Sequence, residues 1–149
     1  MNKSDKRRDL FMLKGPLAKK GYDWWWHNFT GYNRSNGEPK SFFIEYFICN
    51  PARGKDNPVF GQLPANKEAG ITPSYVMIKA GHWGNGARQL HNFYGINALK
   101  REKTRLALEI EDLSLQETYM SGHCSLSDQD VKDHPEYMSD AGNMSWDLK

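Results

Sequence analysis

Five histidines are the side chains of this sequence with the widest choice of chemistry, and their spacing argues against a metal site. They are His27, His82, His91, His123 and His134, and no two stand two apart on an expected strand or four apart on an expected helix. We therefore expect no metal, and expect histidines hydrogen-bonded at the rim of a β-structure. The chain also has no G-x-S-x-G element, P-loop or dinucleotide fingerprint. Phosphate chemistry is excluded, hydrolysis is unsupported because no local signal marks a nucleophile, and no cofactor is expected.

The tryptophans and one carboxyl group suit an apolar ligand instead. Trp24, Trp25 and Trp26 follow one another, and Glu45 is the single charge in an apolar run. Alternation on a strand makes one tryptophan face core and the other a cavity wall, without saying which. Because an indole face stabilises cationic charge and burial raises the pKa of a carboxyl group, Glu45 or His91 would donate a proton to an alkene. The alternatives are a large aromatic core, and a flat exposed tryptophan face that stacks on sugars.

These residues belong to a predicted β-hairpin. Asn36-Gly37 stands between two aromatic-rich runs, residues 22–30 and 41–49. The second run is apolar on both faces, with Phe42, Ile44, Tyr46 and Ile48 on one and Phe43, Glu45 and Phe47 on the other. Such a strand suits the centre of a sandwich or the wall of a barrel around an apolar cavity, where Glu45 needs a partner or water.

The rest of the chain predicts an antiparallel all-β domain with long loops and at most one short helix. Further strands are expected at 74–80, 88–95, 105–115, 117–125 and 143–148, with a bulge near Asp112 and a polar connection at 99–103. Residues 51–73 form a long loop, for which a lid over the cavity and an inert connection are equally open. Ser127 and Asp130 predict the cap of the one short helix.

Composition sets the remaining expectations. The 149 residues suit one domain, residues 21–149, after a partly ordered lead-in, residues 1–20, whose apolar residues 10–13 pack on the sheet. The charged residues from Lys3 to Arg8 are expected to be solvated. A net charge of +2 with both signs interspersed gives no support to nucleic-acid binding. Since no apolar run could span a membrane or serve as a signal sequence, we expect a cytoplasmic protein with Cys49 and Cys124 as buried free thiols.

Four segments in the same order resemble the tocopherol cyclase-like and carotenoid hydratase-like proteins. They are the strand WWWHNF at 24–29, the aromatic strand 42–51 ending in Asn50-Pro51, the element HNFYG at 91–95, and Gly122-His123 followed by MSWDL at 144–148. The resemblance implies a lipocalin-like (calycin-type) barrel or sandwich that binds polyenes or prenylated rings. It further implies cofactor-free cyclisation, hydration or isomerisation. Members of that family have two such domains, so the chain is expected to correspond to the first half, and no catalytic role is carried over.

We therefore expect an apolar ligand-binding domain, with a non-catalytic module for a lipid-like or carbohydrate ligand as the alternative. The expected partners are a hydrophobic small molecule and either a second copy of the chain or a separate second-half polypeptide. The residues expected to line the ligand site are Trp24, Trp26, Glu45, Tyr46, His91, His123 and Trp146, with His82 a weaker candidate.

Overall fold

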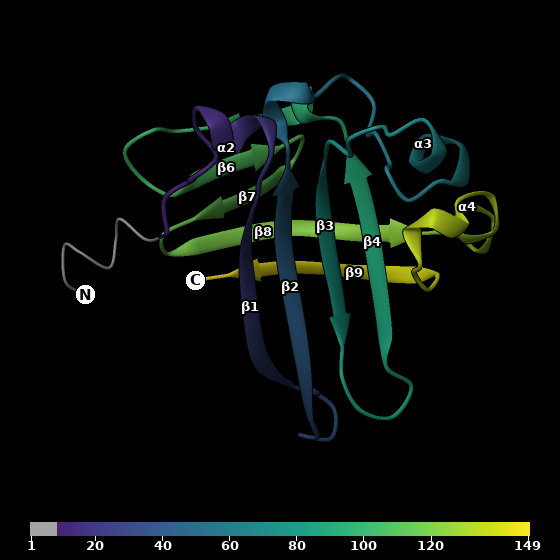
Figure 1. Ribbon diagram of the computed structural model, residues 1–149. Helices are drawn as coiled ribbons and strands as arrows, with labels where there is room; N and C mark the ends of the chain where they lie inside the picture. The colour runs from purple at the N-terminus through teal and green to yellow at the C-terminus, as the bar shows by residue number, and fades with distance from the viewer. Residues whose placement is uncertain (1–8) are drawn as a thin grey trace.

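Two antiparallel β-sheets and a few short helices make up the computed structural model, which describes residues 9–149 (Figure 1). The expected solvated terminus from Lys3 to Arg8 lies outside the described residues. The first sheet has the order β1-β2-β3-β4 and the second the order β5-β6-β7-β8-β9. No strand pair joins the two sheets within residues 9–149, so they form two layers and not a closed barrel. The all-β prediction is confirmed at this level.

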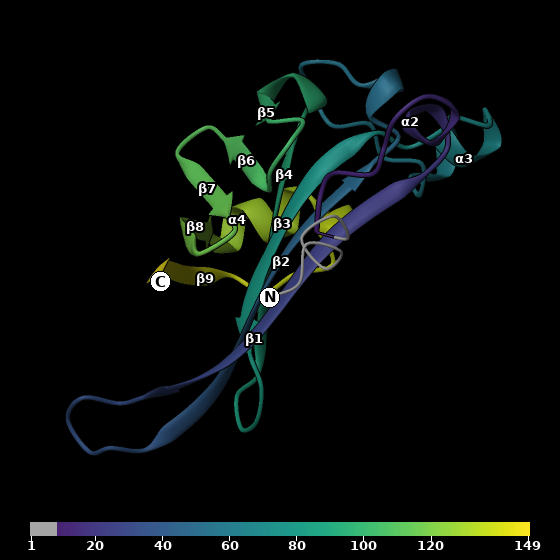
Figure 2. The same cartoon turned by 90° about the vertical axis from the view of Figure 1, so that its left-hand side faces the viewer.

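The first sheet contains the predicted hairpin and the next two predicted strands. Its strands are β1 (Tyr22–Tyr32), β2 (Pro39–Cys49), β3 (Tyr75–His82) and β4 (Arg88–Tyr94). The turn between β1 and β2 is closed by backbone hydrogen bonds between Asn33 and Glu38 and between Gly37 and Asn33. This hairpin extends well beyond the second sheet (Figure 2). Its pairing places Trp25 opposite Tyr46 and Trp26 opposite Glu45.

The second sheet corrects two sequence predictions. Its strands are β5 (Leu99–Arg101), β6 (Ala107–Ile110), β7 (Leu113–Gln116), β8 (Tyr119–Leu126) and β9 (Gly142–Leu148). The expected polar connection at 99–103 contains the short strand β5, which pairs with β6. The expected single strand at 105–115 is a hairpin, because the chain reverses at Glu111 and Asp112 where a bulge was predicted. Glu111 makes this turn with a left-handed φ of 54°.

The core lies between the two sheets, whose strands cross at a steep angle in Figures 1 and 2. The inner face of the first sheet contributes alternate residues, including Trp25, Ile44, Tyr46 and Ile78, and the second sheet contributes Leu108, Ile110, Leu113, Leu115, Cys124 and Trp146. Gly122 lets the β9 tryptophan approach, because a Cβ atom there would lie 2.9 Å from the Trp146 ring. The predicted strand faces are confirmed, as are the two buried free cysteines, Cys49 and Cys124.

Short helices and loops cover the ends of the strands. The α-helices are α2 (Pro16–Lys19), α3 (Pro64–Glu68) and α4 (Asp128–Asp133), and the 3-10 turns are η1 (Pro51–Arg53), η2 (Ile96–Ala98) and η3 (Pro135–Tyr137). Within residues 9–149, three short α-helices thus stand where a single one was expected, and α4 has the predicted capping box of Ser127 and Asp130. Phe11 and Leu13 are buried, as predicted, whereas Met12 is exposed. None of the helices within residues 9–149 has the length and apolar character needed to cross a membrane.

Candidate functional site

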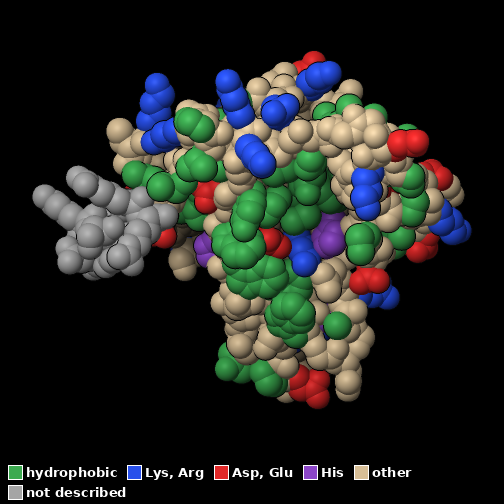
Figure 3. All heavy atoms as spheres, in the orientation of Figure 1, with side chains coloured by type: hydrophobic (Ala, Val, Ile, Leu, Met, Phe, Trp, Pro, Cys, Tyr) green, Lys and Arg blue, Asp and Glu red, His purple; other side chains and the backbone are tan. Residues whose placement is uncertain are grey.

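The outer face of the first sheet, turned away from the second sheet, is aromatic and open to solvent. We call it the aromatic face, and it comprises Tyr22, Trp24, Trp26, Phe43, Phe47, Tyr75, Met77, Trp83 and Phe93. Exposed fractions of 65% for Tyr22, 58% for Trp24, 39% for Trp26 and 43% for Trp83 are large for such side chains. Figure 3 shows hydrophobic side chains gathered over β1 and β2, with acidic, basic and histidine side chains among them. Large contiguous apolar patches of this kind mark binding surfaces.

Strand alternation and register together build this face. Because successive side chains point to opposite sides of a strand, Trp24 and Trp26 lie on the side opposite the core residue Trp25. One row across the four strands consists of Trp26, Glu45, Lys79 and His91, each directly opposite the next. The neighbouring row consists of Trp24, Phe47, Met77 and Phe93. A polar row therefore lies beside an apolar one on the same surface.

Ring contacts tie the aromatic face together on the hairpin side. Trp26 stacks on Phe43 with ring centroids 5.1 Å apart and an angle of 6° between the planes, and Trp83 lies 4.6 Å from the same Phe43 ring. Gly81 allows this packing, because a Cβ atom there would lie 2.7 Å from Phe43 and 2.1 Å from a backbone carbonyl. Phe43 is fully buried as a result, and the two indoles above it carry the exposed surface.

Glu45 is the acidic group of the polar row. Its side chain is only 6% exposed, and burial raises its pKa above the ordinary carboxyl value, while the positive charge of Lys79 acts in the opposite direction. The Lys79 ammonium lies 5.6 Å from the ring centroids of both Trp26 and Phe43, within cation–π range. The face thus combines a carboxyl group, an ammonium group and indole surfaces within one row.

His91 ends the row and is bonded to the backbone of η3. Its Nδ1 lies 2.5 Å from the Tyr137 carbonyl oxygen, and since a carbonyl can only accept, Nδ1 carries the proton. Its Nε2 is buried and has no hydrogen-bond partner among residues 9–149. Burial lowers the pKa of His91 below its usual value, although the bond to Tyr137 acts in the opposite direction. The bond to Tyr137 therefore fixes His91 at the covered β4 margin of the aromatic face.

A wall of aromatic side chains borders the aromatic face on the β4 side. Phe60, from the long loop, contacts Tyr75, Phe93 and Tyr137, with ring centroids 5.8, 4.9 and 5.7 Å away. Tyr137 of η3 lies 4.8 Å from Phe93. Segments distant in sequence therefore cover β4, while β1 and β2 stay open.

A groove of about 400 Å³ continues the aromatic face at the end of the sheet where α2 and η1 lie. Its lining includes Lys20, Tyr22, Phe47, Cys49, Pro73 and Tyr75. Tyr22 and Phe47 belong to both the groove and the aromatic face, and their rings stack with centroids 5.7 Å apart. This volume lies within the roughly 300–1,000 Å³ typical of small-molecule sites.

The residues predicted from the sequence divide between different places in the fold. Trp24, Trp26, Glu45 and His91 come together on the aromatic face. Tyr46 and Trp146 lie in the core between the sheets, where the Tyr46 hydroxyl donates to the Ser114 carbonyl over 3.1 Å. The other two histidines lie apart from both groups. His123 is exposed on the second sheet with its Nδ1 3.5 Å from Asp112, and His82 lines a small pocket of about 150 Å³ between the sheets.

Several residues of the site were not singled out in the sequence. Lys79 and Met77 share the parity of Tyr75 in the predicted strand 74–80, so alternation contained the signal that they lie on one face. Trp83 lies in a glycine-rich turn. A large aromatic side chain is not required to form such a turn, so its presence there was the available signal. Phe60 and Tyr137 come from loops, whose position no periodic pattern predicts.

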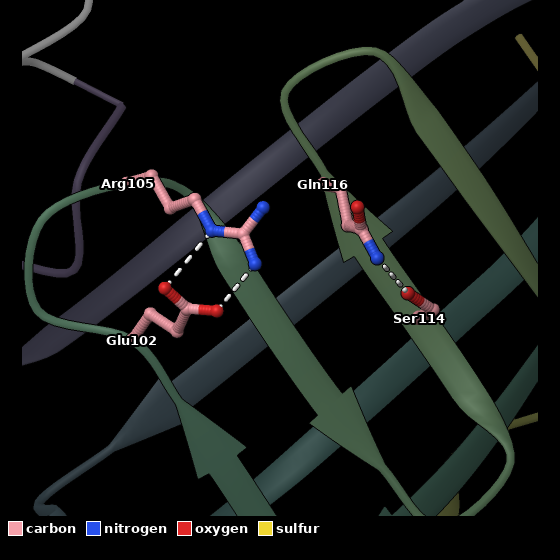
Figure 4. A network of polar contacts seen from close by, with 4 residues as sticks. All are labelled: Glu102, Arg105, Ser114 and Gln116. Atoms are coloured by element: carbon pink, nitrogen blue, oxygen red, sulfur yellow. Dashed lines mark hydrogen bonds and ion pairs between the residues drawn. The ribbon is translucent and has the colours of Figure 1, made fainter.

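Polar side chains on and beside the outer surface of the second sheet form a separate small network. Glu102 and Arg105 form a two-point ion pair, and the Gln116 amide donates to the Ser114 hydroxyl over 3.4 Å (Figure 4). The ion pair lowers the pKa of Glu102. Exposed pairs of this kind contribute little to stability and are no sign of a site.

Neither a metal site nor a known relative adds to this description. No group of three or more His, Cys, Asp or Glu side chains within residues 9–149 is placed to hold a metal ion. No protein-family model, curated protein or solved structure is significantly similar to this chain. The resemblance to tocopherol cyclase-like proteins therefore depends on its four sequence segments alone, and the aromatic face is the candidate site that the geometry itself supports.

Proposed function

We propose that the aromatic face binds an extended apolar ligand of the isoprenoid or polyene type, in a lipocalin-like domain related to the tocopherol cyclase-like proteins. The observation that carries the proposal is the exposure of Tyr22, Trp24 and Trp26 on one continuous surface. Burying such rings against a ligand removes apolar area from water at about 25 cal/mol per Å². The neighbouring Glu45 and Lys79 supply the few polar groups that orient a ligand in an apolar site.

Native mass spectrometry of the purified protein, beside denaturing spectra of the same sample, tests this directly. A co-purified apolar small molecule supports the proposal and identifies the ligand class. A dimer, or a complex with a second polypeptide, and no small molecule would instead mean that protein covers the aromatic face. A bare monomer that also fails to bind added retinol or farnesol would contradict the proposal.

Titration with all-trans-retinol and farnesol then locates the site. Replacing Trp24 and Trp26 together by alanine is expected to weaken binding by about tenfold or more, because two stacking surfaces are lost. The matched control is Tyr119→Ala, which removes a partly exposed aromatic side chain from β8 in the other sheet. Equal affinities for the two variants would place the ligand elsewhere.

The polar row also supports a catalytic version of the proposal. Glu45, with its raised pKa, would protonate an alkene carbon, Trp26 would stabilise the resulting cation, and the Glu45 carboxylate would take back a proton from a different carbon next to the cation. The net reaction is migration of a double bond without a cofactor. A bound ligand recovered unchanged after incubation favours a pure binding module. Loss of product formation in Glu45→Gln, with ligand binding retained, would favour the enzyme.

Carbohydrate binding is the second candidate, because exposed tryptophans on a sheet can stack on sugar rings. Trp24 and Trp26 stand two residues apart, and each exposes more than a third of its side chain on the same side of β1. A panel of oligosaccharides that leaves tryptophan fluorescence unchanged would exclude this function. Quenching by sugars, lost in the Trp24 and Trp26 double variant, would favour it over the apolar ligand.

A further inference from the structure

The aromatic face has two chemically different ends. The groove at one end is bordered by Lys20, and the neighbouring cations are Lys19 at the end of α2 and Arg53 at the end of η1. The Arg53 Nε donates to the Lys19 carbonyl over 2.9 Å, so α2 and η1 are held side by side. All three side chains are exposed. Lysine and arginine side chains gather along this margin of the face, above its hydrophobic patch, in Figure 3.

Few acidic groups offset this positive end. The chain has no Asp or Glu from residue 10 to residue 22, or from residue 46 to residue 55. Asp23 points to the other side of β1, where it accepts from the Met12 amide over 2.7 Å. The Lys20 ammonium has no hydrogen-bond or ion-pair partner among the other residues described. A negatively charged group at the mouth of the groove would meet uncompensated positive charge.

The remainder of the aromatic face suits a hydrocarbon chain. From Cys49 at the groove to Phe43 beneath Trp83, β2 runs over seven residues, and the six steps between them cover about 20 Å. Glu45 lies between these ends directly opposite Lys79, so the positive charge at the centre of the face has an acidic group beside it, whereas the Lys20 ammonium has no ion-pair partner among the described residues. An anionic head is thereby directed to Lys20, and an apolar tail toward Trp26 and Trp83.

We propose, on the basis of the proposed function, that the ligand is a free single-chain amphiphile whose anionic head lies at Lys20, Lys19 and Arg53. Its tail runs along β2 over Phe47 to the indoles of Trp26 and Trp83, which both contact Phe43. The shared chemistry is a long apolar chain ending in a carboxylate or phosphate. A membrane surface fits less well, because the groove at the positive end is concave and has the size of a small-molecule site.

Three ligands with the same apolar tail and different head groups test whether the site prefers a negatively charged head. Oleate, oleyl alcohol and oleylamine are each titrated into the protein at low and high salt, and the change in tryptophan fluorescence gives the affinity. Oleate is expected to bind about tenfold more tightly than oleyl alcohol at low salt, with oleylamine the weakest. Salt should reduce the advantage of oleate, because the cations at this end are exposed.

Two variants test where the head and the tail of the ligand lie. Lys20→Gln is expected to weaken oleate binding about three- to tenfold and to leave oleyl alcohol unchanged. The matched control is Lys40→Gln, an exposed lysine near the other end of β2, which should change neither ligand. Stearate with a nitroxide at the far end of its chain should quench Trp83, so that Trp83→Phe reduces quenching by this probe. Stearate with the nitroxide beside the carboxylate should be affected much less.

The outcomes separate this inference from the proposed function. Equal binding of oleate and oleyl alcohol would overturn the anionic head and leave the apolar site standing. Failure of all three ligands, together with retinol and farnesol, would overturn both. Binding to anionic phospholipid vesicles without binding of free oleate would replace the single ligand by a membrane surface, and would also overturn the inference.

Discussion

Glu45 is a buried carboxyl group whose ionisation is coupled to folding. Burial raises its pKa in the folded protein, so the unfolded chain loses this proton at lower pH than the folded one. The free energy of unfolding therefore falls as pH rises from the ordinary carboxyl pKa through the folded pKa.

Glu45→Gln removes this loss, and the variant should gain stability relative to the parent between acidic and neutral pH. Urea unfolding at a series of pH values measures the gain. The exposed Glu109, changed to glutamine, is the control, and identical pH profiles for the two variants would contradict the assignment.

Tyr46 of the first sheet forms a hydrogen bond to the second sheet through its hydroxyl group. It is fully buried and donates to the Ser114 carbonyl, and burial raises its pKa far above the ordinary tyrosine value. Tyr46→Phe leaves that carbonyl without its partner and should lower the free energy of unfolding by about 1–2 kcal/mol. Tyr119→Phe, which removes a partly exposed hydroxyl, should change it by less than about 0.5 kcal/mol. Urea denaturation compares the two, and equal effects would mean that the bond contributes nothing.

The candidate ligand-binding residues chosen from the sequence show how far residue types alone can identify a site. Trp24, Trp26, Glu45 and His91 share the aromatic face because all four have the correct strand parity and register. Tyr46 was grouped with them although it has the opposite parity to Glu45, and the structure accordingly places it in the core. The type of a residue therefore indicates which reactions it could support. Its odd or even position along a strand decides which other residues share its face of the sheet.

At the scale of elements, the β6–β7 turn is the clearest test of local strain. Glu111 adopts a left-handed conformation that costs a residue with a Cβ atom about 1 kcal/mol. Glu111→Gly should therefore raise the free energy of unfolding by about 0.5 kcal/mol, the relief of strain exceeding the entropy cost of glycine. The same substitution at Glu109, in the extended strand β6, should lower it by about 1 kcal/mol. Thermal or urea unfolding distinguishes the two signs, and a loss of stability in both variants would contradict the argument.

Most elements followed from local patterns, and the exceptions have a physical cause. In the predicted strand 105–115, the inward positions change from Leu106, Leu108 and Ile110 to Leu113 and Leu115. A bulge and a two-residue hairpin turn both produce this change of parity, so the pattern could not separate them. The short strand β5 has only three residues, too few for any period to be visible.

At the scale of the whole molecule, the N-terminal segment closes one edge of the space between the sheets. Phe11 is buried, stacks on Trp25 with centroids 6.3 Å apart, and lies 4.1 Å from the Arg101 guanidinium carbon. Phe11→Ala should lower the free energy of unfolding by about 3–4 kcal/mol, because a large core side chain is lost. Met12→Ala, an exposed neighbour, should cost less than about 0.5 kcal/mol. Similar small losses in both would mean that this segment does not hold the layers together.

The sequence by itself determined most of the strands, the β1–β2 hairpin and the two sets of alternating faces, because these depend on neighbours along the chain. It left open which face of Trp24, Trp25 and Trp26 is core. Alternation says only that Trp25 lies opposite the other two, and the choice depends on which side of the first sheet the β5–β9 sheet covers. The tertiary structure decided this, since β7, β8 and β9 bury the side that carries Trp25 and Tyr46. It thereby left Trp24 and Trp26 on the open side beside Glu45, where a ligand can reach them.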